Sequence, residues 1–355
     1  MHEMNNALQI FGGINSEIFD IREFNIEKGD LLKACQRFNL GSLISYKKEK
    51  NIKISHTNFI VFIETNKGEY VLKFTPLNTY ENITKELLIN ITKELLINKL
   101  VTKHKFPTPV MLTTSRNQPC IKRKNYLISC YLTINGAPLY LKRIDSMKIK
   151  KINGAIKRLN YLLNYYFKKK ELSNLPDKEN FNEKINSLVF TSKKLGHYSN
   201  KKLINFAIKR CCNNYLFNHK KFVKKPIHSN ITLSNMLFRN GKIFILDLSH
   251  IRIDYELNDL ANLIVSFYSL DIPQDKIKKL ISCYFIVNNI QTKKLGVLNN
   301  FVTLHLIKEY LKTIEKEKNV TSSVYQSEFS KIFMLEINNY KKKILRLIKD
   351  FMREN

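Results

Sequence analysis

Acidic residues are scarce in this sequence of 355 residues, and tryptophan is absent. The sequence has 30 Asp and Glu but 60 Lys and Arg, which gives a formal net charge of +30. Such an excess is typical of proteins that bind nucleic acid or anionic membranes. However, it is almost entirely lysine, spread over every segment and accompanied by abundant Asn and Ile. We interpret it mainly as drift toward an A+T-rich coding sequence, with selected polyanion binding as the alternative, and expect no specific nucleic-acid partner.

Three further absences concern the cellular compartment. The six cysteines form no C-x-x-C pair, and no run approaches the roughly 18 apolar residues that a membrane span requires. Residues 1–5 have neither the basic nor the apolar stretch of a secretory signal. We therefore expect reduced, mostly buried cysteines, no membrane association and a cytoplasmic location.

Strand patterns dominate the first third of the chain. Residues 59–65 and 69–74 are β-rich and flank Asn66-Lys67-Gly68, which predicts a hairpin. A helix is expected from about 80 to 103, because the pattern ends before Pro107, and a further strand is expected at 126–132.

Helical patterns dominate the remainder, so the sequence predicts a mixed α+β protein. We expect a helix and a turn over 28–46, a helix from about 143, and helices near 201–218, 256–270, 274–289, 296–317 and 328–353. A chain of this length with 44% hydrophobic residues can form two lobes. We place them at 1–134, as the nucleotide-binding lobe, and at 135–355.

A perfect duplication lies within the helix expected at 80–103. Residues 82–89 read Asn-Ile-Thr-Lys-Glu-Leu-Leu-Ile, and residues 90–97 repeat them. Eight added helical residues lengthen a helix by about 12 Å and rotate its face by about 80°. Glu86 and Glu94 therefore cannot both face one partner. We choose Glu94, because its segment continues directly into the end of the helix.

The strongest chemical signal is a polar loop between apolar segments. Residues 227–238 read Ile-His-Ser-Asn-Ile-Thr-Leu-Ser-Asn-Met-Leu-Phe, and an apolar strand then leads to Asp247. This is the layout of a kinase catalytic loop followed by a metal-binding carboxylate. Asn235 and Asp247 are candidate Mg²⁺ ligands, since this cation prefers oxygen donors; the alternative for Asp247 is a helix cap or a salt-bridged strand end. We expect His228 to order the loop by hydrogen bonding rather than to act as a base.

Asn230 occupies the position at which such loops carry the catalytic aspartate. An amide can position a hydroxyl group but cannot accept its proton. General-base catalysis contributes about 10²–10⁴-fold, so the sequence predicts a large loss of rate without loss of nucleotide or magnesium binding. Asp259, at the start of an expected helix, is predicted to cap that helix or to anchor the loop.

Lys73 completes the groups that phosphoryl transfer requires. Most lysines are solvated, but Lys73 ends a β-rich run and precedes the helix that carries Glu94. A lysine on the phosphates and a glutamate that holds the lysine are recurring parts of kinases. Together with the loop at 227–238, this order favours a phosphate contact for Lys73.

These stretches resemble the aminoglycoside phosphotransferase and choline kinase-like superfamily over roughly residues 28–315. Within it the chain is most similar to the bacterial homoserine kinase branch. The resemblance is carried by residues 38–46, 55–59, 64–72, 106–109, 227–238, 247 and 259–261. It implies an α+β, two-lobed protein-kinase-like fold with a small β-rich N-lobe and a larger, mainly helical C-lobe.

The resemblance also implies site residues. A turn with Ser55 and Asn58 would cover the nucleotide, and Lys73, oriented by Glu94, would contact its phosphates. Asn235 and Asp247 would bind magnesium.

The implied activity is that of a small-molecule kinase with ATP and Mg²⁺ as cofactors. Its acceptor would be a small, amino-acid-like molecule with a hydroxyl group, such as homoserine. The chain departs from the family at Asn230, in place of aspartate, and at Ser229, in place of a small residue. A pseudokinase that binds nucleotide or a partner is therefore the alternative, and a basic nucleic-acid-binding protein is a third hypothesis that only the charge supports.

Overall fold

The computed structural model describes residues 26–48, 58–77, 81–123, 125–141, 143–173, 175, 181–196, 198, 200–218, 224–291, 294–322, 339 and 341–350. The described residues fall into two compact units. The first contains those up to Leu175 together with Thr232–Ile251, and the second contains those of Pro176–Ile231 and from Arg252 onward. The lobe boundary between residues 134 and 135 stays a prediction.

An antiparallel sheet forms the centre of the first unit. Its order is β1-β2-β3-β6-β4, with β5 also paired to β6. The strands are β1 (Leu43–Lys48), β2 (Phe59–Thr65), β3 (Gly68–Pro76), β4 (Met111–Leu112), β5 (Ile121–Lys122) and β6 (Tyr126–Leu132). The expected hairpin is confirmed as β2–β3, and the strand expected at 126–132 is β6. The interpretation of 28–46 as a helix and a turn was wrong beyond residue 42, because the chain there enters β1.

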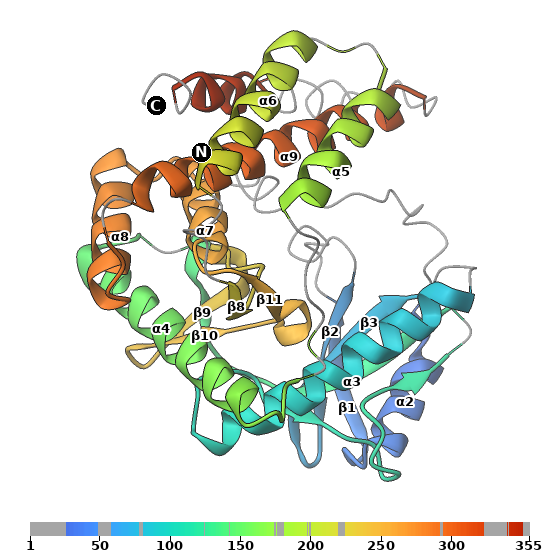
Figure 1. The fold of residues 1–355 in the computed structure, drawn as a ribbon. Coiled ribbons are helices and arrows are strands. Elements are labelled where there is room, and N and C mark those ends of the chain that lie inside the picture. The colour runs from blue at the N-terminus through green and yellow to red at the C-terminus, as the bar shows by residue number, and fades with distance from the viewer. Residues whose placement is uncertain are drawn as a thin grey trace. The chain divides into compact units, whose positions relative to one another are not determined.

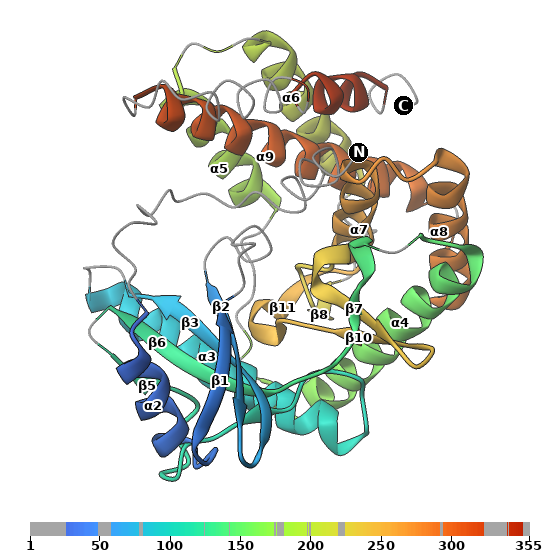
Figure 2. The same cartoon turned by 180° about the vertical axis from the view of Figure 1, so that it is seen from behind.

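The two faces of this sheet are covered by different helices (Figures 1 and 2). Side chains alternate between the faces of a strand. Leu72 and Phe74 of β3 pack with α2 (Lys28–Arg37) in one buried cluster. Leu127 of β6 packs with α3 (Glu81–Lys103) in another. Burial of each such side chain contributes about 1.5–3 kcal/mol, which fixes α3 against the face that also carries Lys73.

A second hairpin in the first unit leads to Asp247. β9 (Met236–Arg239) and β10 (Lys242–Ile245) are antiparallel, and β7 (Ala137–Pro138) joins β9. Asn240 and Gly241 both have positive φ, of 47° and 73°, as the tight turn of a two-residue hairpin requires. Strand β10 confirms the apolar strand expected before Asp247. Helix α4 (Ser146–Lys168) packs against β10.

The second unit is mainly helical. Its helices are α5 (Phe181–Lys194), α6 (Lys201–Asn218), α7 (Asn258–Ser269), α8 (Gln274–Val287) and α9 (Leu295–Ser322), and its strands are β8 (Lys224–Ile227) and β11 (Arg252–Tyr255). The last four helices confirm the periodic segments, whereas α5 was not predicted. The pattern at 328–353 lies mostly outside the described residues, of which 341–350 are helical.

Two expectations from composition can be compared with the structure. Every cysteine is free, and Cys35, Cys120, Cys130 and Cys211 are buried. Within the described ranges, no helix combines the length and the apolar character that crossing a membrane demands.

Candidate active site

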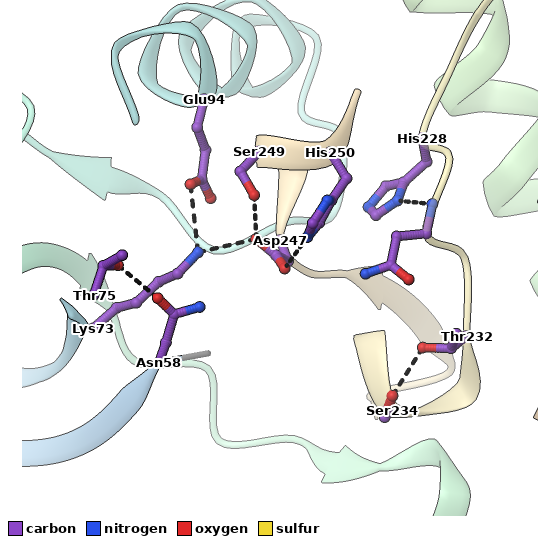
Figure 3. Close-up of polar contacts among 11 residues, drawn as sticks. Asn58, Lys73, Thr75, Glu94, His228, Thr232, Ser234, Asp247, Ser249 and His250 are labelled. Carbon is purple, nitrogen blue, oxygen red and sulfur yellow. Dashed lines mark hydrogen bonds and ion pairs between the residues drawn. The ribbon is translucent and has the colours of Figure 1, made fainter. Parts of the chain in front are cut away.

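Three segments that are distant in sequence bring Lys73, Glu94 and Asp247 together (Figure 3). Lys73 lies on β3, Glu94 on α3, and Asp247 follows β10. The Nζ atom of Lys73 is 2.9 Å from Oδ1 of Asp247 and 3.6 Å from Oε2 of Glu94. All three residues belong to the first unit. The sheet thus supplies a cation, and the helix and the hairpin supply its two anions.

These side chains are largely withdrawn from water. The exposed fractions are 14% for Lys73, 3% for Glu94 and 23% for Asp247. Burial opposes the charged form of each, but Asp247 and Glu94 raise the pKa of Lys73 well above its usual value. Lys73 in turn holds the pKa of Asp247 well below its usual value, although burial alone would raise it. Lys73 and Asp247 are therefore both charged at neutral pH.

Helix α3 is continuous through the duplicated octapeptide. Its second copy places Glu94 in the buried position beside Lys73, whereas Glu86 of the first copy is exposed. The structure therefore separates the two glutamates as the helical rotation requires.

Asp247 adopts an uncommon backbone conformation. Its φ is 57° and its ψ is 64°, in the left-handed region that few residues other than glycine occupy. The hydroxyl of Ser249 donates to Oδ1 over 2.7 Å, and Nε2 of His250 lies 3.3 Å from Oδ2. Such strain is typical of functional sites, and here it turns the carboxylate toward Lys73.

Asn235 lies at the same end of the hairpin as Asp247. It precedes β9, and its backbone oxygen accepts a hydrogen bond of 2.9 Å from the amide of Leu246. Among the described residues, no group of three His, Cys, Asp or Glu side chains could hold a metal ion. Mg²⁺ commonly takes one or two protein oxygens and completes its shell with water and substrate phosphates. The pair Asn235 and Asp247 fits that donor set.

The loop that carries Asn230 belongs to the second unit and is held by α7. The backbone amides of His228 and Ser229 donate to Asp259, over 3.1 and 2.7 Å. The side chain of Asn262 donates to the backbone oxygen of Ser229 over 3.0 Å. Asp259 was expected either to cap its helix or to anchor the loop, and these hydrogen bonds show that it anchors the loop. Burial raises the pKa of Asp259 to about 7, although both backbone bonds lower it.

His228 makes a bond that orders the loop. It is fully buried, and its Nδ1 accepts a hydrogen bond of 3.3 Å from the amide of Asn230 (Figure 3). Because Nδ1 is the acceptor, the neutral ring carries its proton on Nε2.

The residues expected to cover the nucleotide are only partly described. Ser55 lies outside the described residues. Oδ1 of Asn58 accepts a hydrogen bond of 2.6 Å from Thr75, and Thr75 shares a face of β3 with Lys73.

Three apolar residues that the sequence analysis did not single out share the sheet face of Lys73. Ile60 pairs with Lys73 and Phe62 pairs with Val71, so alternation places all of them on the face of Lys73. Ile60 and Val71 are half-buried, and Phe62 is 39% exposed. The two-residue period of β2 and β3 could have revealed this apolar surface.

The fold was compared with known proteins. No family model matches the sequence, and no curated protein matches it. Solved structures match over most of their length. An amicoumacin kinase in complex with AMP-PNP, Ca²⁺ and Ami has a TM-score of 0.66 at 12% identity, with 93% of this chain and 96% of that chain covered. A spectinomycin phosphotransferase in complex with ADP and its antibiotic has a TM-score of 0.61 at 12% identity, covering 93% and 99%. Choline kinase from Cryptosporidium parvum has a TM-score of 0.56 at 13% identity, covering 91% and 97%.

These likenesses concern the backbone rather than the sequence. They agree with the small antiparallel sheet and the helical remainder. The homoserine kinase branch stays a prediction. The chain adopts the protein-kinase-like fold of the aminoglycoside phosphotransferases and choline kinases.

Proposed function

We propose that this protein is an ATP-dependent kinase that transfers the γ-phosphoryl group to a hydroxyl group of a small molecule. The single observation that supports it most is the buried convergence of Lys73, Glu94 and Asp247. An isolated structural ion pair has no need of a second carboxylate. A lysine that contacts phosphate does need a second carboxylate, because that carboxylate holds the ammonium in place.

Nucleotide binding uses the face of the sheet that carries Lys73. Its ammonium binds phosphate oxygens, and Glu94 limits where the ammonium can lie. The apolar surface of Ile60, Phe62 and Val71 offers the packing that a flat purine requires. ATP is the proposed nucleotide.

Asp247 and Asn235 would hold Mg²⁺. The cation supplies neutralisation of phosphate charge. Asp247 is already ionised beside Lys73, so its carboxylate can bind a cation without first losing a proton.

Asn230, at the position where the resembled family carries its catalytic base, limits the rate of the proposed reaction. Its amide positions the acceptor hydroxyl but cannot take the proton. The loss of a general base costs about 10²–10⁴-fold in rate. Asn230 therefore also supports a second candidate function, a pseudokinase that binds nucleotide or a partner with little turnover.

The proposed acceptor is a small, amino-acid-like molecule, with homoserine as the first candidate. The resemblance of residues 38–46, 55–59 and 64–72 to the homoserine branch supports this choice. The structural neighbours include phosphotransferases for antibiotics and for choline, which shows how widely acceptors differ within the fold. A cytoplasmic location is part of the proposal.

The test begins with Mg²⁺-dependent ATP binding by calorimetry and continues with a panel of hydroxylated acceptors, homoserine first. Lys73→Ala is the control. We expect the unchanged protein to bind ATP and the control to lose binding. Product formation no greater than that of the control rejects each acceptor, and equal ATP binding by both proteins rejects the kinase proposal itself.

A further inference from the structure

Two buried polar atoms beside Lys73 make no hydrogen bond within the described residues. They are Oε2 of Glu94 and the hydroxyl oxygen of Tyr131. Tyr131 lies on β6, two residues after Ser129, which pairs with Lys73. Residues two apart in a strand share a face, so Tyr131 points to the side of the sheet on which α3 packs. Its ring also packs against the hydrophobic cluster of that helix.

The two groups act on each other electrostatically. Burial raises the pKa of Glu94, while Lys73 of β3, Tyr131 of β6 and His250 lower it and Asp247 raises it. Burial, and after it Glu94, raises the pKa of Tyr131 well above its usual value. The hydroxyl of Tyr131 is therefore protonated at neutral pH and can only be the donor toward Glu94.

Lys73 alone does not satisfy Glu94. Its ammonium lies 3.6 Å from Glu94 but 2.9 Å from Asp247. When phosphate oxygens accept hydrogen bonds from the Lys73 ammonium, Glu94 must stay ionised to hold the ammonium in place. A carboxylate that is 3% exposed is costly to keep charged without a hydrogen bond. Tyr131 carries the unused donor on the same side of the sheet.

We propose that Tyr131 is a positioning residue of the phosphate-binding site, whose hydroxyl donates to Oε2 of Glu94 and keeps this carboxylate aligned on Lys73. The role rests on the proposed function. Because Tyr131 acts through Glu94 and Lys73, it matters for ligands that carry phosphates. Adenosine, which reaches only the apolar part of the face, does not depend on it.

The test compares two variants that each remove one hydroxyl from β6. Tyr131→Phe removes the proposed donor, and Tyr126→Phe is the matched control. Tyr126 belongs to the buried cluster on the α2 side of the sheet, and its hydroxyl donates to Asp30 of α2. Calorimetry gives Kd for Mg²⁺-ATP and for adenosine, and thermal unfolding gives Tm. We expect Tyr131→Phe to weaken ATP binding roughly tenfold with adenosine unchanged, and Tyr126→Phe to lower Tm with both Kd values unchanged.

A double-mutant cycle with Glu94→Gln tests the route of the effect. If Tyr131 acts through Glu94, Tyr131→Phe weakens ATP binding no further in the Glu94→Gln background. Equal weakening in both backgrounds overturns the proposal, as does a parallel loss of ATP and adenosine binding. An unchanged protein that binds no ATP overturns the kinase proposal and this role with it. An unchanged protein that binds ATP, with Tyr131→Phe equal to it, overturns only the role of Tyr131.

Discussion

Lys73 lies closer to Asp247 than to Glu94, at 2.9 Å against 3.6 Å. The lysine is thus paired first with the carboxylate that we expect to bind the metal ion. A metal ion at Asp247 would compete with the Lys73 ammonium for Oδ1 of Asp247. The ammonium would then be available to contact phosphate oxygens. Metal and nucleotide binding are therefore expected to be coupled.

The first prediction concerns Lys73 itself. Lys73→Met leaves Glu94 and Asp247 without their shared cation, so we expect ATP binding to be lost and the free energy of unfolding to fall by about 3 kcal/mol. Urea denaturation at pH 7 measures the second effect. Lys47→Met, at an exposed position on β1 of the same sheet, is the control and should change neither quantity. A fully stable Lys73→Met protein would contradict the burial of this cluster.

The second prediction concerns the missing base. Asn230→Asp restores a proton acceptor at the position where kinases carry one, and we expect the turnover number to rise about 10²–10⁴-fold. Product formation with the acceptor found in the panel measures this gain, and Asn230→Ala serves as the comparison. If Asn230→Asp is no faster, the pseudokinase becomes the better description of the chain.

The third prediction concerns Asp30, which anchors α2. Arg123 lies 2.7 Å from its Oδ1, and the hydroxyl of Tyr126 donates to its Oδ2. Burial alone would raise the pKa of Asp30, but Tyr126 and Arg123 bring it below its usual value. This stabilisation is therefore complete above the unfolded pKa, near 4, and is lost as the pH falls through the folded pKa.

We expect Asp30→Ala to cost about 3 kcal/mol at pH 7 and to leave Kd for ATP unchanged. Denaturant unfolding from pH 7 down to pH 3 measures the difference from the unchanged protein, which should shrink at the acidic end. A difference that is independent of pH would show that the ionised form of Asp30 contributes nothing.

The fourth prediction concerns Asp259, for which stability changes with pH in the opposite direction. Its pKa is raised by burial to about 7, so the folded chain binds a proton more tightly than the unfolded chain. Stability is greatest below the unfolded pKa and falls as the pH rises to about 7, by an amount on the order of 4 kcal/mol. Asp259→Asn should remove this slope, and Asp275→Asn, at an exposed carboxylate, should keep it. A slope that survives in Asp259→Asn assigns the effect to another group.

Local patterns were enough to predict much of the fold. The β2–β3 hairpin, β6 and four helices of the second unit follow from short-range periodicity. Lys73 and Asp247 were chosen because one lies within an apolar strand and the other follows an apolar strand. Helix α5 was not predicted although its residues also follow a helical period, and β1 was absorbed into the segment of the preceding helix. The roles of Tyr131 and Ser249 depend on tertiary contacts, because an isolated Tyr or Ser in a sequence gives no sign of the neighbour that it meets.

The continuity of α3 through its repeated octapeptide has a consequence for how this gene can change. Removal of either copy yields one and the same polypeptide, in which the glutamate keeps its distance in residues from Lys99 and from the end of the helix. The shortened protein loses about two turns at the start of α3, or about 12 Å, and should still bind ATP as the full-length chain does, which calorimetry can establish. We therefore expect that replication slippage can shorten and restore this helix without interrupting the Lys73–Glu94 pair on which the proposed nucleotide binding depends.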